Sequence, residues 1–238
     1  SAYFIEPGAA AAPASTLPAR RDDLADWGYL PHWRPRLADC VVDVDGGLDA
    51  APARTWLFFM DEAGLGVRAA SRLRAAGHRV IEVRAGDAFA RLDDDRYVLA
   101  PERGREGYEA LVRDLVARGA APSRIAHFWL VTERETYRPG SSFFHRNQEC
   151  GFYSLLFLAQ AASAENLPLP MHLTVFTSGA ARVRSEALAY PEKSTALGPV
   201  RVVPRELPGV TCSIVDLELP VTPATRRLRG RVAAALSG

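Results

Sequence analysis

From residue 55 onward, short apolar runs alternate with longer segments in which apolar residues recur every three or four positions. Short apolar runs are typical of buried strands, and the longer spacing is typical of helices that cover one face of a sheet. The predicted strands are residues 55–60, 79–84, 125–131, 171–177 and 211–217. The predicted helices are residues 65–76, 105–118 and 149–162. This alternation predicts an α/β fold, with a doubly wound, mostly parallel sheet flanked by helices.

The ends of the chain depart from this pattern. Residues 1–25 are rich in Ala, Pro, Ser and Arg without a hydrophobic period, which predicts a linker from an upstream domain. Trp27–Arg36 contains strand-forming aromatic residues, but its prolines restrict it to an edge strand. Pro191–Pro199 predicts a short helix that its final Gly-Pro stops. A basic helix is expected near the C-terminus, at about residues 223–236.

Size and charge limit the classes of function. A chain of 238 residues, of which 48% are hydrophobic, can bury the core of one domain. Its formal net charge of +1 comes from mixed acidic and basic residues, which disfavours nucleic acid and anionic membranes as partners. No apolar run approaches the roughly 20 residues of a membrane span, and no signal peptide is recognisable. A cytoplasmic location is therefore the expectation.

The cysteines do not indicate a disulfide framework or a zinc site. Cys40, Cys150 and Cys212 are widely separated and form no Cys-x-x-Cys pair. We interpret them as ordinary buried thiols.

The turn Asp61–Gly66 joins the first predicted strand to the first predicted helix, where a dinucleotide-binding fold holds its pyrophosphate. Such a site needs three glycines, which let backbone N–H groups approach the phosphates. In the spacing Gly-x-x-x-Gly-x-Gly, Gly64 and Gly66 supply the last two positions, but the first falls on Met60. The turn also carries two carboxylates where an anion would bind. The pattern therefore favours a tight turn that binds no cofactor.

Arg84 is the one residue near this turn that favours a cofactor. It ends the second predicted strand, where the 2′-phosphate of a dinucleotide would lie in a complete site. An arginine at a strand end is commonly just solvated, so the residue does not reverse the interpretation of the turn.

The chain has a single lysine, Lys193, among its 29 basic residues. Short-chain reductases place a Tyr-x-x-x-Lys pair on one helix face, where the lysine lowers the pKa of the tyrosine and orients the cofactor ribose. Here the tyrosine would have to be residue 189, which is Ala189, and Tyr190 is one position too close. No glycine loop of a Walker motif precedes the lysine. The sequence thus predicts neither a reductase pair nor a phosphate loop.

Histidine and cysteine offer further candidate sites. His127 lies inside one predicted strand and His172 begins another. Neither has a second His, Asp or Glu at metal-ligand spacing, so we interpret both as hydrogen-bonded core or rim residues rather than metal ligands. His145 and Cys150 could supply a base and a thiol nucleophile, but no third, orienting group is recognisable. A serine hydrolase is disfavoured because the chain has no Gly-x-Ser-x-Gly elbow.

Residues 133–148 form a long predicted loop after a strand, at the edge where open sheets usually bind ligands. Its length and the aromatic residues Phe143 and Phe144, which we expect to be exposed, make it a candidate contact surface. An insertion without a partner explains the same features equally well.

Four segments, taken together and in order, resemble a known protein family. They are Tyr29–Pro35, Trp56–Gly66, Gly151–Ala161 and Pro191–Pro204. They resemble the structural, non-catalytic N-terminal subdomain of ketoreductase domains in modular type I polyketide synthases. The Pro-Glu-Lys segment, followed by Gly-Pro and Arg, is the most specific of them. The resemblance extends over about residues 26–236.

The resemblance implies a truncated Rossmann fold that packs on a second, catalytic half and stabilises it. In this family the catalytic half binds NADPH and reduces β-ketoacyl groups that the phosphopantetheine of an acyl carrier protein holds. Residues 26–222 would form the structural subdomain, and residues 223–238 would lead toward the catalytic half or an inserted domain. The parent protein would be a multifunctional synthase of secondary metabolism that combines acyl transfer with reduction. No catalytic, cofactor-binding or metal-binding residue is assigned to this chain, because none matches the catalytic motifs.

Two other classes of function remain open. The chain could be a self-contained Rossmann-type enzyme or nucleotide-binding protein, with loop 133–148 as a lid. That hypothesis requires a closed pocket in which Glu133, Tyr137 and His145 meet. The chain could also be a docking or dimer-forming module, which would show a concentration-dependent mass.

Overall fold

The computed structural model describes residues 22–27, 51–133, 142–183 and 188–219. The chain divides into two units, residues 1–38 and 39–238. In the first unit, the described residues contain the 3₁₀-helix η1 (Leu24–Trp27). Apart from Trp27, the predicted edge strand lies outside the described residues, as does the predicted basic helix near the C-terminus.

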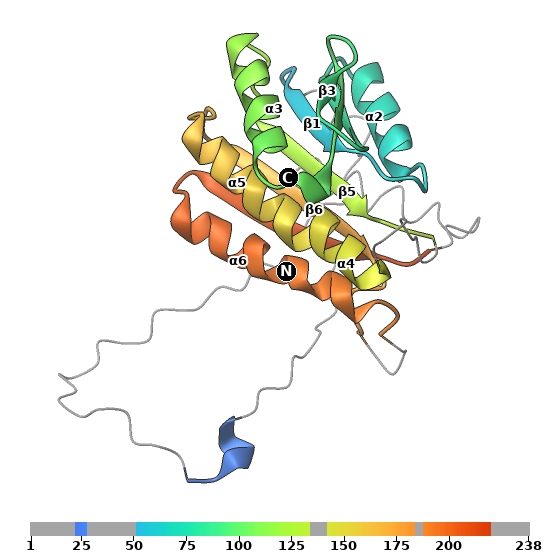
Figure 1. Cartoon of the computed structure of the whole chain (residues 1–238), viewed down its shortest axis with the longest axis vertical. Helices are drawn as coiled ribbons and strands as arrows, with labels where there is room; N and C mark the ends of the chain where they lie inside the picture. The colour runs from blue at the N-terminus through green and yellow to red at the C-terminus, as the bar shows by residue number, and fades with distance from the viewer. Residues whose placement is uncertain (1–21, 28–50, 134–141, 184–187, 220–238) are drawn as a thin grey trace, which may run out of the picture. The chain divides into compact units, whose positions relative to one another are not determined.

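The second unit is built on a seven-stranded sheet with the order β3-β4-β2-β1-β5-β6-β7 (Figure 1). Its strands are β1 (Thr55–Phe59), β2 (Arg79–Ala85), β3 (Ala90–Arg91), β4 (Arg96–Leu99), β5 (Arg124–Leu130), β6 (Met171–Ser178) and β7 (Val210–Leu217). All neighbouring strands pair in parallel, except that β3 is antiparallel to β4. The predicted α/β class and mostly parallel, Rossmann-like sheet are confirmed.

Helices cover both faces of the sheet, as the doubly wound prediction requires. They are α2 (Leu65–Ala75), η2 (Pro101–Arg103), α3 (Glu106–Ala117), α4 (Phe143–Asn147), the π-helical segment η3 (Gln148–Tyr153), α5 (Ser154–Ala164), η4 (Pro191–Ala196) and α6 (Leu197–Glu206). Figure 1 shows α3, α5 and α6 side by side, with α2 apart from them. No helix among the described residues is long and apolar enough to cross a membrane.

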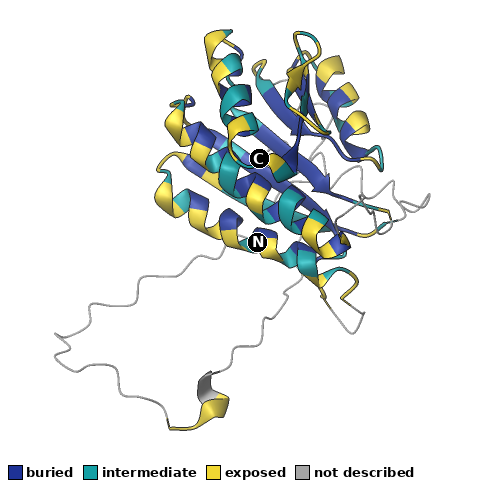
Figure 2. Cartoon of the chain, viewed as in Figure 1, coloured by how far each residue is buried: buried dark blue, intermediate teal, exposed yellow. Residues whose placement is uncertain are grey.

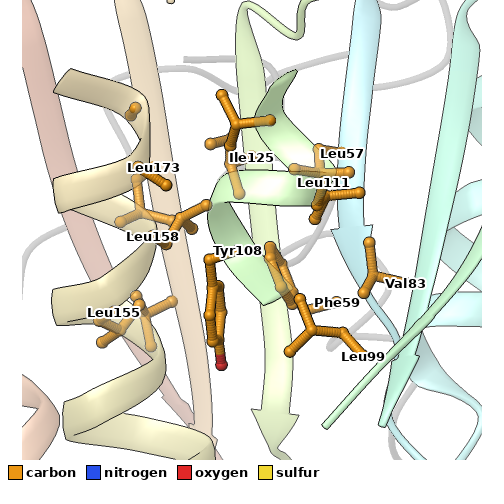
Figure 3. Packing of buried hydrophobic residues seen from close by; sticks show 14 of the residues in the cluster. Leu57, Phe59, Val83, Leu99, Tyr108, Leu111, Ile125, Leu155, Leu158 and Leu173 are labelled. Carbon is orange, nitrogen blue, oxygen red and sulfur yellow. The ribbon is translucent and has the colours of Figure 1, made fainter. Parts of the chain in front are cut away.

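Alternate residues of each strand supply two separate cores. In β1, Leu57 and Phe59 face α3 and α5, whereas Trp56 and Phe58 belong to the core under α2. Figure 3 shows the larger core, in which Tyr108 of α3 lies close to Phe59. Each large apolar side chain buried in this way contributes roughly 1.5–3 kcal/mol to folding. Figure 2 shows the result, with buried strands and helices that expose only their outer faces.

Two predicted element boundaries were wrong. The helix predicted from residue 149 is preceded by α4, which begins at Phe143, because the Ser142 side chain accepts a hydrogen bond from the His145 backbone amide at 3.2 Å and caps it. Gly198 and Pro199 do not stop a helix but lie in the first turn of α6. A proline is tolerated there because first-turn N–H groups have no acceptor within the helix.

The strand order places a topological switch point at the carboxyl ends of β1 and β5. From β1 the chain continues to β2 and β4 on one side, and from β5 to β6 and β7 on the other. The connections therefore leave in opposite directions and open a crevice between the two strands. Ligands of open α/β sheets bind in such a crevice.

Candidate functional site

A cavity of about 180 Å³ lies at this switch point. Its walls come from the ends of β1, β2 and β5 and from α4 and η3: Met60, Asp61, Glu62, Ala63, Ala85, Trp129, Val131, Thr132, Glu133, Arg146, Asn147 and Cys150. The acids in this wall outnumber the single arginine. A phosphate in the cavity would therefore meet a net negative charge.

Asp61 sits at the entrance to α2 and is 4% exposed. Its Oδ2 accepts a hydrogen bond from the Leu65 amide at 2.9 Å, and its Oδ1 accepts one from the Gly66 amide at 2.6 Å. Burial raises the pKa of the Asp61 carboxyl, while these hydrogen bonds and the nearby Arg68 oppose the shift. The carboxylate thus takes the N–H groups at the helix N-terminus that would otherwise bind an anion.

The geometry of the turn leaves little room for a phosphate. Gly64 adopts a φ of +82°, which lets the chain reverse before the helix. A Cβ added to Gly66 would lie 2.9 Å from Asp61 Oδ1 and 3.4 Å from the Phe128 ring, so the carboxylate already fills the space beside this glycine. The expectation of a tight turn agrees with this packing.

Arg84 has a partner within its own strand. Its Nη2 lies 3.6 Å from Oε2 of Glu82, and its side chain is 54% exposed. Glu82 also accepts a 2.8 Å hydrogen bond from Nη1 of Arg74, a residue of α2. The arginine expected to favour a 2′-phosphate is therefore already next to a carboxylate.

Lys193 is fully buried, which the sequence pattern did not predict. Its Nζ donates hydrogen bonds to Thr132 Oγ1 at 2.7 Å, to the Ser178 carbonyl at 2.9 Å and to Ser178 Oγ at 3.0 Å. It also lies 4.4 Å from the centroid of the Tyr190 ring. Burial lowers the pKa of Lys193 to about 8, with Asp216 and Glu192 acting in the opposite direction.

Tyr190 and Lys193 lie next to one another at the start of η4. Tyr190 precedes η4 and Pro191 begins it, as the sequence predicted. The lysine amine contacts the face of the tyrosine ring and donates its hydrogen bonds to residues at the ends of β5 and β6. Its status as the only lysine was the one signal in the sequence that could have drawn attention to it.

The two strand histidines are hydrogen-bonded, as predicted. His127 is fully buried, with Nε2 2.8 Å from Ser154 Oγ and its ring stacked on Phe59 at 4.8 Å. Burial lowers its pKa to about 3. His172 lies at the rim, where Nδ1 is 2.7 Å from Thr211 Oγ1 and burial lowers its pKa. No metal-ligating cluster of three residues occurs among the described residues.

The structure does not bring His145 and Cys150 together as a base and a nucleophile. Nδ1 of His145 lies 3.0 Å from Ser142 Oγ, within the cap of α4. Cys150 is 5% exposed on η3, and burial raises its pKa to about 12. A thiol in this environment is protonated at neutral pH and is a weak nucleophile.

The proposed lid is only partly described. Residues 134–141, including Tyr137, lie outside the described residues, and Phe143–Gln148 is helical rather than loop. Glu133 lines the cavity, but His145 is not among the lining residues. Phe143 is 7% exposed and packs on Tyr190, contrary to the expectation of an exposed ring, whereas Phe144 is 55% exposed as expected.

Arg146 and Asn147 are cavity residues that sequence reasoning missed. Asn147 is buried, and its Nδ2 donates a 2.8 Å hydrogen bond to the Phe143 carbonyl. Arg146 Nη1 lies 4.0 Å from Glu102 Oε2. They reach the cavity because α4 begins earlier than the apolar pattern indicated.

Comparisons with known proteins agree with this fold. A family model described as beta-ketoacyl synthase-like, N-terminal, matches residues 59–230. No curated protein matches the chain.

Three solved structures illustrate the range of its structural relatives. A keto acid-selecting nonribosomal peptide synthetase module, with adenylation, ketoreductase and pseudo Asub domains, has 23% identity and a TM-score of 0.72; the match covers 87% of this chain and 16% of that one. An N-terminal ketoreductase from the macrolactin assembly line has 19% identity and a TM-score of 0.54. That match covers 69% of this chain and 32% of the ketoreductase. A short-chain dehydrogenase/reductase-family oxidoreductase from Brucella ovis, in complex with a partially ordered NAD, has 15% identity and a TM-score of 0.54, covering 79% and 94%.

The chain therefore spans only 16% and 32% of the two ketoreductase-containing structures, and its likeness to all three is one of fold. The family model, by contrast, extends over well more than half of the chain. The predicted resemblance to the N-terminal part of synthase ketoreductases is confirmed, and the chain belongs to the beta-ketoacyl synthase-like, N-terminal family.

Proposed function

We propose that this chain is the non-catalytic structural subdomain of a polyketide synthase ketoreductase, formed by residues 26–222. It stabilises a catalytic half that uses NADPH to reduce β-ketoacyl groups carried on the phosphopantetheine of an acyl carrier protein. The catalytic half and the other domains of the synthase would be its partners. Membership of the beta-ketoacyl synthase-like family and the ketoreductases among its structural relatives support this assignment.

The observation that carries the proposal is the carboxylate of Asp61 at the N-terminus of α2. In a working dinucleotide site, this helix end and its glycines receive the pyrophosphate. Here an internal anion already accepts the first two N–H groups of the helix, and further acids line the cavity beside it. The fold keeps the sheet of a dinucleotide-binding domain, but the Asp61 side chain occupies the N-terminus of α2, where a phosphate would bind.

The experiment is calorimetric titration of the chain with NADPH, beside an intact ketoreductase that contains both halves. We expect no binding heat for the chain and one NADPH per molecule for the intact domain. A second arm mixes the catalytic half with this chain and measures the thermal midpoint of the catalytic half, which should rise when the chain is present. Tight, stoichiometric binding of NADPH by the chain itself would contradict the proposal.

The cavity favours one alternative, a self-contained Rossmann-type enzyme or nucleotide-binding protein with residues 133–148 as a lid. Glu133, Arg146 and Cys150 converge on it, which is the kind of pocket such an enzyme needs. A small ligand that fills the cavity would raise the thermal midpoint of the chain without any partner present. That result, together with turnover by the chain by itself, would replace the structural proposal.

A further inference from the structure

Arg124, the first residue of β5, is a partly buried arginine. Its Nε is buried without a hydrogen-bond acceptor, and its guanidinium forms no ion pair within the residues that the structure describes. A guanidinium is effectively always charged, and its nitrogens can only donate hydrogen bonds. Because a partly buried charge is costly unless an opposite charge or acceptors accompany it, the surroundings of Arg124 are incomplete.

The register of the sheet places Arg124 in a row of side chains on the face that α2 covers. Its partners are Trp56 on β1 and His172 on β6, and His172 is in turn opposite Thr211 on β7. Side chains in register on parallel strands point to the same face, and Trp56 belongs to the core under α2. The row lies at the amino ends of β5, β6 and β7, whereas the cavity lies at the carboxyl ends of the strands.

A second arginine adds to the positive charge of this row. Arg54 lies two residues before Trp56, and its carbonyl accepts a 3.0 Å hydrogen bond from the Arg79 amide at the start of β2. Burial, and then the charge of Arg54, lower the pKa of Arg124, and no carboxylate of the described residues opposes this shift. Two like charges therefore lie near one another, and the described part of the chain supplies no anion to compensate them.

The other polar groups of the row show what is missing. Nδ1 of His172 lies 2.7 Å from Thr211 Oγ1, and its Nε2 lies 3.1 Å from Ser213 Oγ, so this histidine is fully hydrogen-bonded. Trp56 Nε1, like Arg124 Nε, is buried without an acceptor among the described residues. The indole and the guanidinium can only donate. The row therefore lacks an acceptor rather than a donor, which is what an anion would supply.

The charge of the row indicates the class of anion. A carboxylate carries one negative charge and would leave one of the two arginines uncompensated. A phosphate group carries about −1.5 to −2 charges near neutral pH, and its several oxygens match the paired N–H donors of guanidinium groups. Nucleic acid fits less well, because two arginines contact too few phosphates to hold a charged polymer. The charges therefore favour a single phosphate group.

We propose that Arg54 and Arg124 bind the phosphate group of a free phosphate ion or of a small phosphate ester, at the amino ends of β1 and β5. This arginine site does not depend on the proposed function. A small anion on a partly exposed surface makes few contacts, so we expect a dissociation constant of about 1 mM for inorganic phosphate. Binding of this strength is distinct from the tight, stoichiometric NADPH binding that would contradict the structural subdomain.

Nuclear magnetic resonance of the ¹⁵N-labelled full chain tests the arginine site. Sodium phosphate is titrated at pH 7.5 against sodium chloride of equal ionic strength, and the amide signals of Arg124 and His172 are followed. We expect saturation in the native chain and binding weaker by about tenfold or more in Arg124→Gln. Arg201→Gln removes an exposed arginine of α6 and should leave the affinity unchanged. Shifts that never saturate, or equal affinities in the native chain and Arg124→Gln, would overturn the proposal.

Further titrations identify the source of the phosphate. Tighter binding of glycerol 1-phosphate than of inorganic phosphate would assign the site to an ester, and equal or weaker binding would assign it to the phosphate ion. Acetate tests the class of anion, because a single charge should bind about tenfold more weakly. Acetate that binds as tightly as phosphate would overturn the assignment to phosphate.

Thermal unfolding gives a second readout that does not rely on one variant. We expect about 50 mM phosphate to raise the thermal midpoint of the native chain by roughly 5–9 °C, and of Arg124→Gln by less than half as much. Arg54→Gln should behave in the same way and replaces Arg124→Gln if that variant does not fold. An equal rise in the native chain and in the folded variant would refute the arginine site.

Discussion

Oδ1 of Asp61 lies 2.6 Å from the amide nitrogen of Gly66, so the side chain at the start of the turn binds the backbone at its end. Hydrogen bonds to an ionised acceptor are short and are about twice as strong as neutral ones. The carboxylate also faces the positive end of the α2 dipole. The arrangement is that of an anion bound to a helix N-terminus, with the anion supplied by the chain itself.

Replacing Asp61 by Ala removes this internal anion. We expect the free energy of unfolding to fall by about 1–2 kcal/mol, the usual cost of losing a side-chain cap on a helix. Urea unfolding followed by circular dichroism measures it. Glu62→Ala removes the adjacent, exposed carboxylate and should change stability by less than about 0.5 kcal/mol. Equal losses in the two variants would show that Asp61 does not cap α2.

Substituting Gly66 tests the packing on the inside of the same turn. A methyl group there would press on the Asp61 carboxylate, which cannot retreat without losing its bonds to α2. We expect Gly66→Ala to lower the free energy of unfolding by about 1–3 kcal/mol, the range of overpacked sites.

Gly198→Ala is the matched control for that substitution. Its added Cβ would meet only the Phe152 ring, at an ordinary contact distance of 3.5 Å. Because alanine favours helices more than glycine does, this variant should be neutral or gain up to about 1 kcal/mol. Thermal unfolding of both variants under one condition gives the comparison, and a loss at residue 198 as large as at residue 66 would contradict the packing argument.

The fold was largely predictable because its signals are local. The apolar runs that became β1, β5 and β6 are buried on both faces, and such strands remain visible as continuous hydrophobic segments. The absence of the first glycine, whose position Met60 occupies, could also be recognised in the sequence. A dinucleotide turn requires its glycines at fixed spacing over a few residues. The features that depend on residues close together in the sequence, such as these strands and this turn, could therefore be predicted.

The hydrogen bonds of Lys193 and the cavity were not predictable from the sequence, because they join residues that lie far apart in the chain. Lys193 meets Thr132 across 61 positions of sequence, and Thr177 meets Asp216 across 39. An exposed lysine and a buried one look alike in a sequence, and only the closeness of three strand ends distinguishes them here. The early start of α4 was missed for another reason, since its only local signal is the Ser142 cap.

The burial of His127 predicts that the free energy of unfolding decreases at acid pH. Burial lowers its folded pKa to about 3, while an unfolded histidine titrates near 6.5. Below pH 6.5 the unfolded chain therefore binds a proton that the folded chain does not. The stability that His127 contributes is full above pH 6.5 and falls by about 1.4 kcal/mol per pH unit as the pH drops toward 3.

His127→Gln should remove that part of the acid slope while keeping a hydrogen-bonding group for Ser154. Urea unfolding between pH 4 and 7 gives the slope for each protein. Loss of the ring stacked on Phe59 should also lower stability at pH 7, by about 1 kcal/mol. An unchanged acid slope in the variant would mean that His127 is not the group that titrates.

Cys150 is the cysteine in the cavity wall, so its reactivity shows whether the cavity contains a reactive thiol. Its side chain is buried on η3, and burial raises its pKa to about 12, so almost no thiolate exists at neutral pH. We expect iodoacetamide at pH 7.5 to leave Cys150 unmodified in the native chain and to modify it fully in urea. Peptide mass spectrometry identifies which cysteine has reacted.

His145→Ala provides the control for that labelling. A catalytic pair would depend on the histidine, so its removal would slow the modification of a reactive Cys150. In this structure His145 contacts the Ser142 cap instead, and the variant should label no differently from the native chain. Rapid labelling of native Cys150 that disappears in His145→Ala would favour the self-contained enzyme over the structural subdomain. Slow labelling in both proteins is the result expected for a buried, protonated thiol in a structural subdomain.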